Sequence, residues 1–166
     1  MMVMKFTRNG DKPHVICCQR DDGTQTWMHA DEFFVLHDLS HYVLEKALGY
    51  QTAFMGMLNN GMDIKDFEDR EKRMRITVTL EARHAENMAN LFLMEQFQGR
   101  LENFNQVCLE AFQSANPGFP APVIGEQDVS AIRMELAKQV RAWSALQAGQ
   151  TMELPFVFKK ADRILP

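Results

Sequence analysis

The sequence predicts an α+β domain in which a small antiparallel sheet packs on three main helices. Turn residues separate short runs of alternating hydrophobicity in the first thirty residues, and the hydrophobic period then changes to that of helices. A short strand-like segment follows the last predicted helix. The 166 residues predict a single domain spanning 1–166, long enough to bury a core without a disulfide or metal.

The N-terminal strands are predicted by turn signals. Two turn sequences, around Gly10 and Gly23, separate three candidate strands over residues 3–7, 14–20 and 24–28. In the third candidate, threonine and methionine alternate with more polar or bulky residues, as in a half-buried strand. Such a three-stranded meander must pack its apolar face on the helices that follow, because isolated strands are marginally stable in water.

The remaining elements follow from helical periodicity and breaker residues. The main helices are expected over residues 32–48, capped by Asp31; over 80–112, kinked or split at Gly99; and over 128–147, capped by Asp128. A short helix is expected over 52–58, an exposed loop or helical turn over the charged residues 62–75, and a closing strand over 151–156, added to the meander.

Composition excludes several classes of function. The chain has 18 basic and 22 acidic residues, so its net charge of -4 does not predict a nucleic-acid partner. It has no run of 18 apolar residues and no N-terminal signal-peptide pattern, so no membrane partner is expected. Cys17, Cys18 and Cys108 form a poor disulfide framework and predict free thiols in a reducing, cytoplasmic setting. A small-molecule substrate and self-association stay open.

A polar stripe on the first predicted helix is the main functional signal. On a helical wheel of about 100° per residue, His41 and Glu45 lie about 40° and 80° from His37. Asp38 lies at about 100° on the same wheel, and the apolar residues of the helix occupy the arc from about 200° to 340°. The stripe therefore adjoins the buried face of the helix.

This stripe is suited to a divalent metal. Imidazoles one helical turn apart can direct ring nitrogens at one point, so His37 and His41 are the expected ligands. Glu45 is expected as a ligand or as a residue that positions water, and Asp38 as the catalytic base or as a partner that orients a histidine. Zinc is the leading metal by ligand type, with nickel, iron and manganese open.

Two resemblances support a site here. The run His37-Asp38-x-x-His41 resembles the His-Glu-x-x-His motif of zinc metalloproteases, with Asp38 at the position of the general base. Three segments, Asp22 to Trp27, Phe33 to Glu45 and Ala53 to Met57, resemble a family of small uncharacterised bacterial proteins with an HDLxHYxxE helix after a DGTxTW strand. The second resemblance implies a shared fold and a shared site.

A further ligand is expected from the second long helix. Glu81 and His84 have the Glu-x-x-His spacing of di-metal carboxylate bundles, and His84 is expected to complete the site if the two helices pack side by side. Glu81 and Glu86 are the other candidates. The alternative interpretation of Glu81 and His84 is an exposed first turn whose acidic residue favours the helix dipole.

Two function hypotheses follow from these patterns. The first is a metal-binding protein, with a metal-dependent hydrolase as its sharper form. The second is a non-catalytic protein- or ligand-binding domain, in which His37, His41 and Glu45 form a structural polar network. The substrate and the oligomeric state do not follow from the sequence.

Overall fold

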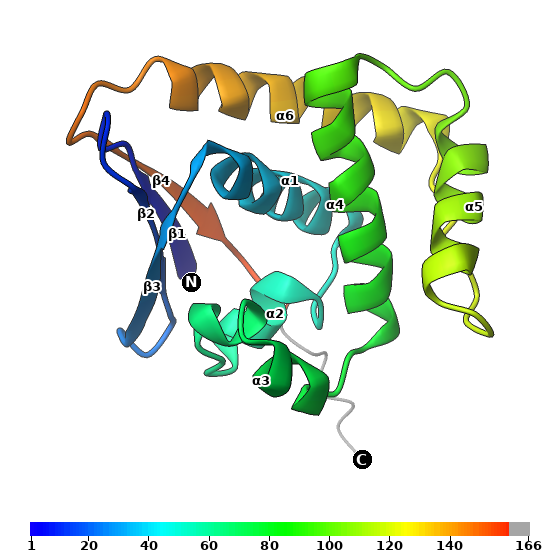
Figure 1. Ribbon diagram of the computed structural model, residues 1–166, viewed down its shortest axis with the longest axis horizontal. Coiled ribbons are helices and arrows are strands. Elements are labelled where there is room, and N and C mark those ends of the chain that lie inside the picture. Colours follow the sequence, from blue (N-terminus) through cyan, green and yellow to red (C-terminus); the bar gives the residue numbers. More distant parts are fainter. Residues whose placement is uncertain (160–166) are drawn as a thin grey trace.

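The computed structural model describes residues 1–159 and has a four-stranded antiparallel sheet with helices on one face (Figure 1). The strands are β1 (Met2–Thr7), β2 (His14–Gln19), β3 (Gln25–Ala30) and β4 (Thr151–Phe156), in the order β3-β2-β1-β4. Because β4 pairs antiparallel with β1, the predicted closing strand and the α+β class are confirmed.

One face of the sheet is apolar. Along β1, Met2, Met4 and Phe6 are buried, and the residues between them are only half-buried. In β3 the same alternation buries Thr26 and Met28, as its sequence predicts. That strand runs to Ala30, two residues beyond its predicted end.

Helix α1 (Glu32–Leu48) is the centre of the molecule. The Asp31 side chain accepts a hydrogen bond from the Phe34 amide at its start, and Gly49 ends it with a left-handed φ of 69°. The sheet covers one side of α1, and α4 (Leu80–Gln98) and α6 (Glu126–Ser144) cover the other (Figure 1). Every side chain from Val35 to Glu45 except His37 is therefore buried.

One expected helix break is present, and one helix start differs from the sequence-based expectation. The predicted helix over 80–112 is split at Gly99, one of the two outcomes expected there, because Gly99 adopts a φ of 89° and ends α4 before α5 (Phe104–Ala115) begins. The prediction that Asp128 caps the last helix is wrong, since α6 begins at Glu126 with Gly125 as its N-cap. Asp128 lies in the first turn, where a carboxylate favours the helix dipole.

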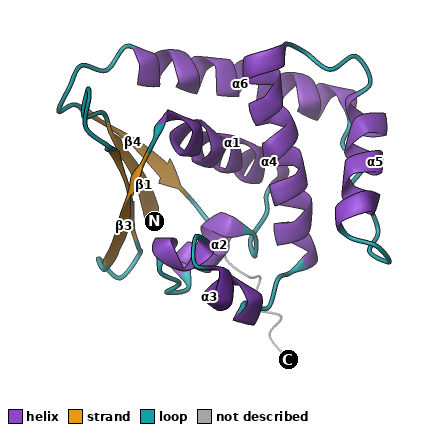
Figure 2. Cartoon of the chain, in the orientation of Figure 1, coloured by secondary structure: helices purple, strands orange, loops and turns teal. Residues whose placement is uncertain are grey.

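The charged residues 62–75 form short, largely exposed helical turns. Helix α2 (Phe54–Asn59) is followed by the 3-10 helix η1 (Ile64–Phe67) and by α3 (Arg70–Arg75) (Figure 2). Helix α3 buries none of its residues. These turns border the cavity described below.

The structure also bears on two expectations from the sequence, about membrane-spanning helices and about the cysteines. No helix within residues 1–159 combines the length and the apolar character needed to cross a membrane. Cys17, Cys18 and Cys108 are free thiols.

Candidate metal centre

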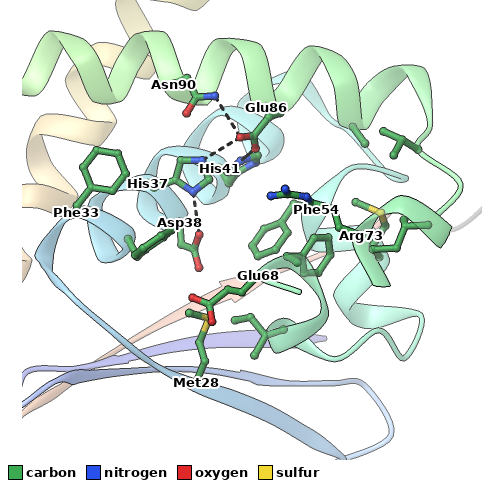
Figure 3. Close-up of a pocket in the computed structure, with 17 residues that line it drawn as sticks. Met28, Phe33, His37, Asp38, His41, Phe54, Glu68, Arg73, Glu86 and Asn90 are labelled. Atoms are coloured by element: carbon green, nitrogen blue, oxygen red, sulfur yellow. Dashed lines mark hydrogen bonds and ion pairs between the residues drawn. The ribbon is translucent and has the colours of Figure 1, made fainter. Parts of the chain in front are cut away.

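Two imidazoles and a carboxylate converge between α1 and α4. His37 and His41 lie one turn apart on α1, with ring centroids 4.7 Å apart, and Glu86 faces them from α4 (Figure 3). One potential ligand atom from each residue lies within 4.8 Å of the other two. The structure thus brings together the two histidines predicted as ligands.

The distances fit a single ion. His41 Nε2 lies 2.9 Å from one Glu86 oxygen, and His37 Nε2 lies 3.5 Å from the other. Ligands at the usual ~2.0–2.1 Å from a tetrahedral zinc ion are roughly 3.3 Å from one another. Small rotations of these side chains would therefore place all three donors around one ion.

A second carboxylate stands behind each histidine. His41 Nδ1 lies 2.9 Å from Glu45 Oε1, and His37 Nδ1 lies 3.2 Å from Asp38 Oδ1. A carboxylate at Nδ1 favours the tautomer with its proton on that atom, which leaves the Nε2 lone pair free to bind a metal. Both histidines are thus held in an orientation that suits a shared ion, and loss of the Nε2 proton would give the tautomer that binds a metal.

Glu45 is fully buried and supports more than His41. Its two oxygens accept hydrogen bonds from the Phe54 and Met55 amides, at 3.2 and 2.9 Å, at the start of α2. The N-cap residue there, Ala53, offers no side-chain acceptor, so the Glu45 carboxylate satisfies the free amides of α2. The sequence predicts Glu45 as a ligand or as a residue that positions water; the structure places it behind His41, not among the converging donors.

Helical geometry separates the candidates on α4. Glu81 accepts hydrogen bonds from the Gln51 and Thr52 amides and holds that loop. His84 donates to or accepts from no member of the cluster; its Nε2 lies 2.8 Å from the Pro120 carbonyl oxygen. Residues 84 and 86 point about 200° apart around a helix, so the structure places His84 away from the cluster that Glu86 joins.

Glu86 was only one of several candidates in the sequence, but a signal for it exists. Ala82, Ala85 and Ala89 are buried on the face of α4 that packs on α1. Small residues at this spacing let two helices approach closely, and Glu86 shares their face. A carboxylate within such an alanine stripe is directed at the neighbouring helix.

In the metal-free protein, contacts within the cluster shift the pKa values of His37, His41 and Glu86. Burial of His41 opposes its charged form, but hydrogen bonds to Glu45 and Glu86 outweigh burial and raise its pKa to about 10. The pKa of His37 is also raised: burial opposes protonation, and contacts with Asp38 and Glu86 favour it more strongly. Burial acts to raise the pKa of Glu86, but the two imidazoles hold it well below its usual range. In the metal-free protein, protonation of the imidazoles thus supplies the positive charge that a metal ion would supply beside Glu86.

The cluster is buried on the side of His41 and Glu45 and open to solvent on the side of Glu86. His41 and Glu45 are 3% and 0% exposed, whereas the Glu86 side chain is 57% exposed. In front lies a cavity of about 450 Å³, within the usual range for small-molecule sites. Its wall includes the rings of Phe33, Phe34, Phe54 and Phe67, with Ile64 and Val78.

Removing the Glu45 carboxylate is expected to destabilise the fold. In a Glu45→Ala variant, the buried His41 Nδ1 and two α2 amides lose their partner, and we expect unfolding free energy to fall by about 3–5 kcal/mol. Urea denaturation measures this change. Glu110→Ala, which removes an exposed carboxylate from α5, is the control and should stay within about 0.5 kcal/mol of wild type. Equal stability of the two variants would contradict this assignment.

Comparisons with known proteins found no relative of this chain. No protein-family model, no curated protein and no solved structure matches the chain. The resemblance of its first 60 residues to small bacterial proteins stays a prediction, and the functional argument rests on the geometry of the site.

Proposed function

We propose that this protein binds one divalent metal ion through His37, His41 and Glu86 and uses it to hydrolyse a small molecule held in the adjacent cavity. The observation that carries the proposal is the convergence of three donor groups from two helices, with both imidazoles backed by carboxylates. Three protein ligands leave coordination positions open, as in catalytic sites.

Zinc is the metal that we propose. Two histidines and one glutamate form a ligand set of catalytic zinc sites. The same donors also suit non-haem iron, so the identity of the metal must be measured. A bound divalent metal lowers the pKa of coordinated water towards neutrality and thereby supplies a nucleophile.

The protein's own residues would prepare the site for this chemistry. Glu45 and Asp38 fix the orientations of His41 and His37, and Asp38 also lines the cavity. The apolar wall would exclude bulk water and strengthen electrostatic interactions at the open front. In this arrangement Asp38 is a positioning residue, one of the two roles expected for it from the sequence.

One observation favours the competing hypothesis of a structural polar network. With His41 protonated, as its raised pKa of about 10 implies, both of its ring nitrogens donate to carboxylates without any metal. A non-catalytic binding domain could keep the cluster in this state. Metal analysis separates the two hypotheses.

We expect untagged protein to bind about one equivalent of zinc. A Glu86→Gln variant and the His37→Ala, His41→Ala double variant should each lose stoichiometric zinc, because each removes donors of the site. Equilibrium dialysis followed by elemental analysis measures the stoichiometry, and circular dichroism checks the fold. His84→Ala is the matched control, because it removes a histidine that lies outside the cluster.

The same variants test hydrolysis. Chelation should abolish turnover of chromogenic esters, zinc should restore it, and Glu86→Gln should not be restored. A folded wild-type protein that binds no divalent metal would contradict the proposal and favour the polar network. Metal binding unchanged in Glu86→Gln would show that the ligand set is wrong.

Metal binding should release protons. At pH 7 His41 is protonated because its pKa is raised to about 10, and its Nε2 must lose that proton to bind a metal. We expect about one proton or more released per ion and tighter zinc binding as pH rises from about 6 to about 9. Titration calorimetry in buffers of different ionisation enthalpy measures the release.

The free energy of unfolding of the metal-free protein should fall as pH rises, whereas zinc affinity rises. A raised histidine pKa stabilises the fold below its unfolded-state value of about 6.5, and the contribution is lost as pH rises towards about 10.

Proton release near zero when zinc binds at pH 7 would contradict the assigned protonation of His41.

A further inference from the structure

The cavity beside the cluster is lined by an arginine, Arg73, whose side chain has no protein partner among the described residues 1–159. Arg73 lines the cavity and extends into it from α3, towards the side occupied by His41 and Glu86 (Figure 3). Within residues 1–159, no ion pair or hydrogen bond of the Arg73 side chain is present. Its neighbour Lys72, by contrast, pairs with Asp66 at 3.0 Å. A guanidinium left free in a cavity is a ready partner for an anion.

Most of the residues that line this cavity are apolar. The rings of Phe54 and Phe67 stack edge to face with centroids 4.8 Å apart, and Ile64 and Val78 line the cavity with them. Such a wall suits a compact hydrocarbon or aromatic body. The charged end of a ligand would then meet Arg73.

The other charges in the cavity limit the charge of that ligand. Asp38, Glu68 and Glu86 are carboxylates that line the same cavity, but Asp38 and Glu86 are paired with the imidazoles of His37 and His41. Within residues 1–159, Glu68 and Arg73 are therefore the charged side chains of the lining that lack such a partner. A dianion such as a phosphate monoester would meet more repulsion than one guanidinium offsets. A monoanion is the better match.

We propose that the cavity binds a small carboxylic acid as its monoanion, with its carboxylate on Arg73 and its apolar body against Phe54 and Phe67. The part of the ligand that would react faces His37, His41 and Glu86, and this part of the inference rests on the proposed function. Recognition by Arg73 itself requires no metal, so the two proposals can fail separately.

Paired ligands test the proposal. Phenylacetate, benzoate and 3-methylbutanoate are each compared with the corresponding uncharged amide, by titration calorimetry on metal-free and on zinc-loaded protein. We expect at least one acid to bind metal-free protein about tenfold more tightly than its amide, the usual effect of a charge-assisted hydrogen bond. Arg73→Ala should abolish that difference. Glu68→Gln should preserve or increase it, because a repulsive charge is removed.

Arg75→Ala is the matched control, because Arg75 lies on the same short helix and is exposed like Arg73, but does not line the cavity. It should bind the acids as wild type does. The proposal is overturned if no acid binds better than its amide, if Arg73→Ala leaves the preference unchanged, or if phenyl phosphate binds more tightly than the acids. Metal content measured after incubation with zinc keeps the outcomes apart: Arg73-dependent binding of an acid by a protein that takes up no divalent metal would support this inference and contradict the proposed function.

Discussion

The hydrogen bond between the buried Glu45 carboxylate and His41 is the interaction on which the site depends. It fixes the imidazole, and the same carboxylate satisfies the first amides of α2, so α1 and α2 are joined behind the cluster. A buried carboxylate is tolerated only with such partners. Together with the burial of Phe54, Met55 and Leu58 in the core, this group holds α2 and the part of the cavity wall that α2 provides through Phe54.

The site has different physical environments on its two sides. Behind His41, charge is enclosed and fully hydrogen-bonded; in front, Glu86 and Arg73 face a cavity whose wall is otherwise mostly apolar. The candidate metal ligands come from α1 and α4, whereas Arg73 comes from the short, exposed α3. Under the two proposals, the ion and the ligand would therefore be held by different parts of the chain.

The sequence predicted those features that depend on local periodicity. The sheet, the central helix and the shared face of His37 and His41 follow from spacings within one element. The candidate ligand on α4 could not be chosen from the sequence, because His84 and Glu86 can both bind a metal and only the packing of α4 on α1 selects the face. In the sequence, Arg73 is one of many charged residues in a segment typical of a solvated surface. Only its position in the lining of the cavity distinguishes it from the neighbouring charged residues.

The most direct test of the central claim is anomalous diffraction from crystals of the zinc-loaded protein, measured on both sides of the zinc absorption edge. The account predicts one strong anomalous peak within ~2.0–2.2 Å of the Nε2 atoms of His37 and His41 and of a Glu86 carboxylate oxygen. A zinc peak elsewhere, with the Glu86 carboxylate still hydrogen-bonded to both imidazoles, would contradict it.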